Sequence, residues 1–278
     1  MNSKRKTAQF LGFAVLVILA AVWSLAPIIW IVLSSLKPAK LIFDLPPVFV
    51  FRPTFANYVN VLAEWPRLAS SFKNSLIITF SAALLTIIVS VVTAYALSRF
   101  RFPGRGLFAS LLILIRMLPP IVMIIPLFPL AHQLNLIDTY VFLAVLYAAF
   151  GVSFAAWVTK SFLDNLPLSQ EEAALLDGCT RFQAFLRVVL PQMKPAIAAV
   201  AIYTTISFWN EFLFGLVFTR YDAVPAPVIV AEMLNSVQGL EWGQLFAATT
   251  ILVLPVLVMT WLIQRQMIAG FTLEGGEQ

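Results

Sequence analysis

Residues able to do chemistry are sparse in this 278-residue chain. It has one histidine, His132, and one cysteine, Cys179, so neither an intrachain disulfide nor a zinc cluster can form. No Gly-Lys pair occurs among the 11 glycines, which excludes a phosphate-binding P-loop. A metalloprotease HExxH motif and paired intramembrane aspartates are also absent. The sequence therefore predicts a chain with no catalytic residues and no metal site.

Three polar residues lie inside long apolar segments. Arg116 is the only charge in 106–137, and Glu211, preceded by Asn210, is the only charge in 195–219. Ionisable groups inside a bilayer usually face a bundle interior or a water-filled path. At 1.5 Å per residue, Arg116 falls near the middle of its span and Glu211 nearer the outer end. Asn210 and Glu211 are predicted to line the path. For Arg116 a path role and a structural role stay equally open, as does pairing with Glu211.

A soluble-looking stretch, 169–191, stands between two apolar segments and reads SQEEAALLDGCTRFQAFLRVVLP. Its spacing predicts two helix-starting capping boxes, Ser169 with Glu172 and Thr180 with Gln183. Gly178 is placed to end the first helix in a left-handed conformation. Four apolar residues then have the spacing of one helix face: Phe182, Phe185, Leu186 and Val189. We expect two short helices that pack on their own bundle or enter a groove on a partner, with Pro191 and Pro195 at the end of the loop.

The elements that position these residues are membrane-spanning helices. A mean hydropathy of +0.92 and a hydrophobic content of 61% exceed what a soluble core needs. Alternating strands of about 10 residues, as a membrane β-barrel requires, are absent, so we predict an all-α polytopic protein. The prediction is a single domain, 1–278, with six spans at approximately 10–33, 75–97, 107–130, 140–159, 196–218 and 243–264.

The distribution of Lys and Arg predicts the orientation. These residues gather at the N-terminus, in 98–106, in 160–194 and in the tail, whereas 131–138 and 220–241 together hold only Arg220. Basic residues are retained in short cytoplasmic loops, so both termini and the stretch 169–191 are predicted to be cytoplasmic. The longer first connection is an exception, with five basic residues at Lys37, Lys40, Arg52, Arg67 and Lys73.

Two further features of charge are explained by membrane insertion. Lys4-Arg5-Lys6 precedes an uncharged run, 7–36, that is longer than a signal peptide needs, so we expect a retained anchor. The net charge of +5 follows from the cytoplasmic bias and gives no reason to expect nucleic acid as a partner.

Several motifs carry a family resemblance. Glu172-Ala173-Ala174, three residues, Gly178, nine residues, Val188, one residue and Leu190-Pro191 resembles the EAA loop of ABC-importer permeases, departing only at Val188, where the family has Ile. Residues 10–273 resemble the smaller, six-helix permease of maltose-type importers, through Asn57-Tyr58, Phe72-x-Asn74-Ser75, Tyr95-x-Leu97-Ser98-Arg99-Phe100-x-Phe102-Pro103-Gly104, Pro126-Leu127 and Trp209-Asn210-Glu211. The tail after Gly270-Phe271-Thr272 departs from the family pattern.

The resemblance implies a type I ABC importer permease in a prokaryotic inner (plasma) membrane. It implies import of a sugar or related polyol, delivered by an extracytoplasmic solute-binding protein, through this chain and a homologous second permease. Two ATP-binding subunits would bind ATP and Mg, and this chain would bind no cofactor. Their clefts would receive the coupling loop, 161–194, through Glu171, Glu172, Ala173, Ala174, Asp177, Gly178, Phe182, Phe185 and Pro191.

The outer loop 219–244 resembles the last external loop of these permeases, which faces the binding protein. The residues expected at that contact are Pro225, Pro227, Gly239 and Gly243. An ordinary solvated connection is the alternative. Trp209 and Tyr203 are expected to pack rather than to bind sugar, and His132 to be a polar residue at an outer helix end.

Two other classes of protein are weighed against the importer. An ion-driven secondary transporter also has proline-broken helices and buried charges, but it leaves the EAA spacing unexplained. A membrane enzyme needs a catalytic set that a single histidine without intramembrane aspartate does not supply. Neither the particular sugar nor direct contact between this chain and sugar follows from the residues.

Overall fold

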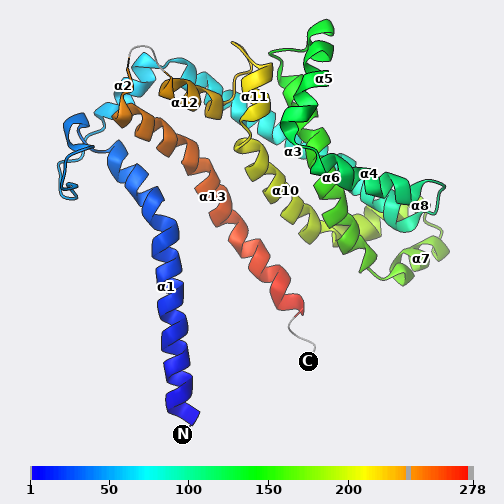
Figure 1. The fold of residues 1–278 in the computed structure, drawn as a ribbon. Coiled ribbons are helices and arrows are strands. Elements are labelled where there is room, and N and C mark those ends of the chain that lie inside the picture. The colour runs from blue at the N-terminus through cyan, green and yellow to red at the C-terminus, as the bar shows by residue number, and fades with distance from the viewer. Residues whose placement is uncertain (1, 236–238, 275–278) are drawn as a thin grey trace. The chain divides into compact units, whose positions relative to one another are not determined.

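The computed structural model describes the backbone of residues 2–235 and 239–274, and side chains within 10–235 and 239–261. In these ranges every regular element is helical (Figure 1). In chain order the elements are α1 (Asn2–Ser35), η1 (Ala39–Leu41), α2 (Ala56–Glu64), α3 (Arg67–Arg99), α4 (Arg105–Met117), α5 (Pro120–Gln133), α6 (Tyr140–Asp164), α7 (Leu168–Leu176), α8 (Arg181–Ala184), the π-helical turn η2 (Phe185–Val189), α9 (Leu190–Gln192), α10 (Lys194–Trp209), α11 (Leu213–Phe218), α12 (Ala226–Leu234) and α13 (Trp242–Glu274).

The helices include enough long apolar segments for a polytopic membrane protein. Four are long and apolar enough to cross a bilayer: Phe10–Ser35, Arg67–Arg99, Tyr140–Asp164 and Trp242–Trp261. Two bent helix pairs raise the number to six by length and composition, if each pair is one span. This agrees with the predicted all-α class, and the four unbroken helices coincide with the predicted first, second, fourth and sixth spans. The bounds of all six spans stay a prediction.

Two of the predicted spans are interrupted. The third, 107–130, is divided into α4 and α5, which meet at 98°. Leu118, with ψ of 129°, is extended as a residue before proline should be, and Pro119 and Pro120 cannot continue the backbone hydrogen-bond ladder of α4. The fifth, 196–218, is divided at Asn210, between α10 and α11. The intramembrane polar residues therefore lie at helix breaks.

By its internal contacts the chain divides into two compact units. The first comprises Met1–Ala69 and Val230–Leu254, and the second Ser70–Ile229 and Pro255–Gln278. In the first unit the Asn57 side chain donates to the carbonyls of Ser35 and Lys37, both at 2.8 Å, and so ties α2 to the end of α1. The predicted coupling loop and both helix breaks belong to the second unit.

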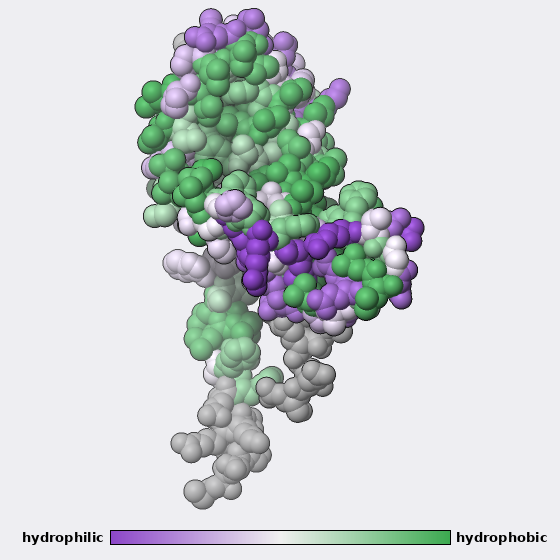
Figure 2. All heavy atoms as spheres, turned by 90° about the vertical axis from the view of Figure 1, so that its right-hand side faces the viewer, coloured by the Kyte–Doolittle hydropathy of each residue, from purple (hydrophilic) through white to green (hydrophobic). Residues whose placement is uncertain are grey.

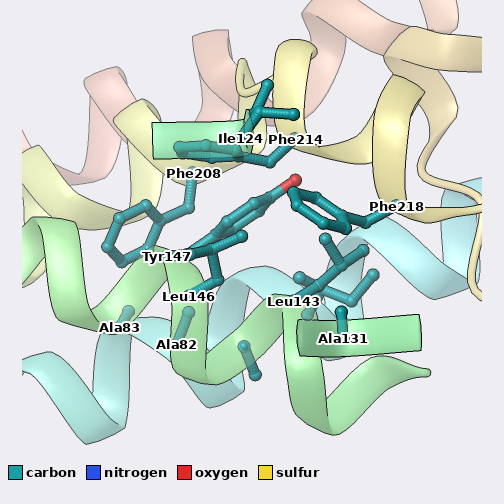
Figure 3. Close-up of a cluster of buried hydrophobic side chains, with 12 residues drawn as sticks. Ala82, Ala83, Ile124, Ala131, Leu143, Leu146, Tyr147, Phe208, Phe214 and Phe218 are labelled. Carbon is teal, nitrogen blue, oxygen red and sulfur yellow. The ribbon is translucent and has the colours of Figure 1, made fainter. Parts of the chain in front are cut away.

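The core of the second unit is an aromatic cluster at the break between α10 and α11 (Figure 3). Tyr147 of α6 lies between Phe208 of α10 and Phe218 of α11, with ring centroids 5.7 Å apart for Tyr147 and Phe208. Phe214 of α11 packs on Tyr147 and Phe218, each at 6.4 Å. These contacts anchor both sides of the break to one helix, α6, and so fix the position of Asn210 and Glu211.

Candidate functional site

The first helix of the candidate coupling loop begins two residues earlier than the sequence predicts, with Pro167 and not Ser169 at its N-cap position. Pro167, with φ of −61°, precedes Leu168, and no side chain caps the N-terminus of α7. The predicted capping box of Ser169 and Glu172 is therefore wrong. Proline fixes a helix-compatible φ and removes an N–H that would otherwise need a partner, so the chain enters α7 without a side-chain cap.

The junction between α7 and α8 is as predicted. Gly178 has φ of +87°, and the Cys179 N–H donates to the Ala174 carbonyl at 3.0 Å, the pattern of a left-handed helix end. A capping box then starts α8: the Gln183 N–H donates to Thr180 Oγ1 at 3.3 Å, and the Thr180 N–H donates to Gln183 Oε1 at 2.9 Å. This junction is determined by residues close in sequence, which is why the spacing alone reveals it.

The predicted apolar face of the second helix is wrong. Phe185 and Val189 are buried, with 8% and 3% of their surface exposed, whereas Phe182 and Leu186 are 69% and 42% exposed. The π-helical turn Phe185–Val189 adds a residue to the helical turn, so the i, i+3, i+4 spacing no longer keeps these side chains on one face.

Pro191, which was predicted to end the loop together with Pro195, lies exposed inside α9 and does not interrupt the helical segment. The change of direction comes at Met193, where Arg181–Gln192 and Lys194–Trp209 meet at 70°. Pro195 occupies the first turn of α10, where its missing N–H has no intrahelical acceptor to lose. The α7–α9 segment (residues 168–192) is therefore continuous with α10 through one bend.

Glu171 fastens α7 to the end of α3. Its carboxylate accepts a hydrogen bond from the Tyr95 hydroxyl and forms a salt bridge with Arg99, whose Nε lies 3.1 Å from Oε2. Both charged side chains are nearly buried, at 10% exposure for Glu171 and 7% for Arg99. Arg99 also donates to the Leu166 carbonyl at 3.3 Å. We call Tyr95, Arg99 and Glu171 the Glu171 anchor.

The predicted partner-contact residues fall into a buried group and an exposed group. Three are turned inward and buried: Glu171, Ala174 and Phe185. Six are exposed: Glu172, Ala173, Asp177, Gly178, Phe182 and Pro191. Leu176, which the sequence pattern did not single out, is 89% exposed. Sequence reasoning included Glu171 as a contact because it adjoins the EAA motif; its burial depends on Arg99, which is 72 positions away.

The exposed face of the α7–α9 segment contains both hydrophilic and hydrophobic residues. Figure 2 shows hydrophilic residues across the lower front, where this segment lies, interrupted by hydrophobic patches. An apolar cavity of about 300 Å³ adjoins it, lined by Val92, Tyr95, Phe100, Arg181, Phe182 and Phe185. Among the described residues, no group of three or more His, Cys, Asp or Glu is placed to hold a metal ion. Acidic and apolar groups side by side are suited to contact with another protein.

Arg116 lies in the last turn of α4 and is not paired with Glu211. Its Nη2 donates to the Tyr203 hydroxyl at 2.6 Å. Its guanidinium carbon is 4.7 Å from the centroid of the Phe154 ring, which in turn lies 4.2 Å from the ring of Tyr203. Tyr203 therefore does pack, as predicted, but it also supplies a hydrogen-bond partner for the intramembrane cation.

Glu211 and Asn210 complete the helix ends at the second break. The Glu211 carboxylate accepts from the N–H groups of Phe214 at 2.9 Å and Gly215 at 3.3 Å, which belong to the first turn of α11. A carboxylate there satisfies free N–H groups and complements the helix dipole. Asn210 donates from its side chain to the Ile206 carbonyl at 2.8 Å. These contacts give both residues a structural task, and a path role stays a prediction.

A second polar region, which sequence reasoning missed, fixes residues 219–226. The Asp138 carboxylate accepts four backbone N–H groups at 2.8–3.1 Å, from Arg220, Tyr221, Asp222 and Ala223. Burial alone would raise the pKa of Asp138, but these four hydrogen bonds outweigh it and hold the pKa below its usual range. We call this set of contacts the Asp138 clamp.

Asn74 and Ser75 of α3 hold the same segment from the other side. Asn74 donates to the carbonyls of Asp222 and Val224, at 2.8 and 3.0 Å, and the Ser75 hydroxyl accepts from the Ala226 N–H at 2.8 Å. The motif Phe72-x-Asn74-Ser75 contains both residues, but sequence spacing does not show that they contact a segment about 150 positions away.

The expected contacts with a binding protein are largely not exposed. Pro225 is buried against Gly215, Pro227 is half-buried in α12, and Gly243 is buried against the Asn57 carboxamide. Of the four expected residues only Gly239 is exposed, with φ of +99°. The pattern of Pro and Gly suggested an open loop, whereas α12 forms within it. Residues 236–238 of the predicted contact loop lie outside the described residues.

Comparisons with known proteins place most of the chain in one protein family. The family model described as "Binding-protein-dependent transport system inner membrane component" matches residues 86–267. The chain is 34% identical to the diacetylchitobiose uptake system permease protein NgcG of Streptomyces coelicolor, over 94% of this chain and 86% of that protein. It is 33% identical to the trehalose/maltose transport system permease protein MalG of Thermococcus litoralis, over 92% of each.

A solved structure has the same fold. A chain from a bacterial ABC transporter involved in import of the acidic polysaccharide alginate matches with a TM-score of 0.81 and 23% sequence identity. The match covers 95% of this chain and 98% of that chain.

Proposed function

Because the chain belongs to the family of binding-protein-dependent transport system inner membrane components, we propose that it is the permease of an ATP-driven importer of a sugar or related polyol. Family membership confirms the resemblance drawn from the EAA spacing, and with it a non-catalytic, multi-pass subunit of the inner membrane. The relatives named for diacetylchitobiose and for trehalose/maltose support a carbohydrate as the substrate class.

In the α7–α9 segment an exposed face lies beside the buried Glu171 anchor, and this combination supports the proposed mechanism. Glu172 and Phe182 face outward, while Glu171, next to Glu172 in sequence, is held by Arg99 of α3. We propose that the exposed face of the α7–α9 segment enters a cleft on an ATP-binding subunit, where ATP and Mg are bound. A displacement of that face would pass to α3 through the Glu171 anchor.

A second route leads from the same segment into the membrane. Arg181–Gln192 continues into α10 through the bend at Met193, and α10 ends at Trp209, next to the break at Asn210. A rotation of the α7–α9 segment would therefore displace α10 and with it the break. This is how ATP hydrolysis on another chain would open and close a path lined by polar residues at helix breaks.

The proposed assembly contains this chain, a homologous second permease, two ATP-binding subunits and an extracytoplasmic binding protein. Of the four residues expected at the contact with the binding protein, Gly239 is the exposed one. We expect mass measurement of the intact detergent complex to show one copy of this chain with one of the second permease. Two copies of this chain without a second permease would contradict that composition.

The experiment for the function as a whole is uptake by proteoliposomes that contain the complete importer. A panel of radiolabelled sugars, including maltose, trehalose and diacetylchitobiose, would be tested with ATP inside or outside and with or without the binding protein. We expect uptake of at least one sugar that requires both. Uptake without ATP-binding subunits would instead identify an ion-driven transporter, and uptake of no carbohydrate in the panel would contradict the substrate class.

A further inference from the structure

Most N–H donors of the Arg116 guanidinium have no acceptor among the described residues. A guanidinium has five N–H donors, and the described residues supply one acceptor, the Tyr203 hydroxyl. No salt bridge involving Arg116 forms among the side chains that the structure describes. The ring of Phe154 holds the plane of the guanidinium without using its donors. Arg116 is exposed, and four of its N–H groups have no acceptor among the described residues, so α4 presents a cation positioned by Phe154 and Tyr203.

The location of this cation favours a binding role over an accident of packing. Ionisable residues inside membrane proteins usually face a bundle interior or a polar path, and transporters build substrate sites where helices are interrupted. Arg116 lies two residues before the α4–α5 break at Leu118, and Tyr203 lies on α10, which ends at the break that contains Asn210. The negative C-terminal end of α4 compensates only part of its charge.

We propose that Arg116, oriented by Phe154 and Tyr203, is an anion-recognising subsite of the translocation path, which favours a sugar that carries a carboxylate. The planar guanidinium presents parallel N–H groups that match both oxygens of a carboxylate, a geometry that lysine does not offer. The proposal rests on the proposed sugar import and narrows its substrate class from sugars in general to acidic sugars.

The test uses the complete importer in lipid nanodiscs, trapped with ATP, Mg and vanadate. Binding of radiolabelled glucuronate is compared with that of glucose, which has the same ring but no carboxylate. We expect glucuronate to bind at least about 10-fold more tightly, the difference that a charge-assisted hydrogen-bonded pair typically supplies. Arg116→Gln should remove this preference, and Arg116→Lys should retain only part of it.

Arg101→Gln is the matched control, because Arg101 is an exposed arginine outside the cluster. It should leave the preference for glucuronate unchanged. Equal binding of the two sugars, or no Arg116-dependent glucuronate binding, would overturn the proposal. If Arg116→Gln instead lowers recovery of the second permease while glucuronate binding shows no dependence on Arg116, the arginine pairs with that subunit and is not a subsite.

Failure of this inference is distinguishable from failure of the proposed function. Neutral sugars that enter proteoliposomes with ATP and the binding protein, at the same rate in wild type and Arg116→Gln, would leave the importer assignment intact and reject the anion subsite.

Discussion

The second unit carries two polar anchors, the Glu171 anchor and the Asp138 clamp, which are built differently. In the first, one carboxylate meets a cation and a hydroxyl from another helix, and the adjoining face stays exposed. In the second, one carboxylate accepts four successive backbone N–H groups, and Asn74 and Ser75 hold the same segment from α3.

The two anchors differ in how much of the backbone they hold. The Glu171 anchor holds α7 through one side chain, and Phe185 and Val189 add buried apolar contacts farther along the α7–α9 segment. The Asp138 clamp immobilises the backbone itself over residues 220–223, so this connection serves as a rigid corner. We therefore expect a displacement to pass through the side-chain contacts of the α7–α9 segment and not through the clamped backbone of residues 220–223.

Breaking the Glu171 anchor should have the largest effect on stability. Arg99→Ala leaves the Glu171 carboxylate buried without its cation, a change that typically costs about 3–5 kcal/mol. We expect a large fall in the thermal unfolding midpoint of the purified complex and loss of the ATP-binding subunits. Lys160→Ala is the control, since its salt bridge with the more exposed Asp164 spans one helical turn and is worth about 0.3–0.5 kcal/mol. Equal midpoints for the two variants would refute the anchor.

Weakening the Asp138 clamp should have a smaller effect of a different kind. Asp138→Asn replaces one acceptor oxygen by an NH₂ group that faces backbone donors, at a cost of about 2–3 kcal/mol. Thermal unfolding should report this loss, while the ATP-binding subunits should stay attached because the α7–α9 segment is untouched. Loss of those subunits from Asp138→Asn would remove the distinction between the two anchors.

The same carboxylate predicts a pH dependence. Its pKa is lower in the folded chain than in the unfolded chain, so the unfolded chain binds more protons and stability falls as the medium is acidified. The contribution is complete above the usual aspartate range and is lost as the pH falls through the lowered pKa. The difference in unfolding midpoint between wild type and Asp138→Asn should therefore shrink in acid. A constant difference down to strongly acidic pH would contradict the clamp.

A substitution on the exposed face of the α7–α9 segment should change the free energy of unfolding least. Phe182 is 69% exposed, so Phe182→Ala should alter stability by no more than about 0.5 kcal/mol while weakening attachment of the ATP-binding subunits. Phe185→Ala, three residues away and buried, should cost about 3–5 kcal/mol. Pull-down of the ATP-binding subunits together with thermal unfolding separates the two. Unchanged attachment in Phe182→Ala would exclude this side chain from the contact.

The sequence predicted contacts between residues that are close along the chain and missed contacts between residues that are far apart. The junction at Gly178 and the Thr180–Gln183 box involve neighbours, and spacing identified both. The burial of Glu171 beside an exposed Glu172 depends on Arg99, far away in sequence, and no local pattern distinguishes the two acids.

The remaining differences have causes that residue types do not encode strongly. The π-helical turn at Phe185–Val189 has no clear sequence signature, yet it determines which aromatic residues are exposed. The third span, 107–130, was predicted as one segment, whereas Pro119 and Pro120 interrupt it and α4 and α5 meet at 98°. The Asp138 clamp joins positions more than 80 residues apart, and a single aspartate in a loop predicts nothing.

The central claim is that the α7–α9 segment couples ATP hydrolysis to transport, and a matched pair of glycines tests it most directly. Gly178 and Gly104 both have positive φ, at 87° and 84°, with no atom within 4 Å of an added Cβ, so valine imposes a similar backbone cost of about 1–2 kcal/mol at either. The measurement is ATP hydrolysis stimulated by the loaded binding protein, together with uptake, in proteoliposomes. We predict that Gly178→Val assembles but loses stimulation and uptake, while Gly104→Val keeps both. Normal stimulation and uptake in Gly178→Val would contradict the claim.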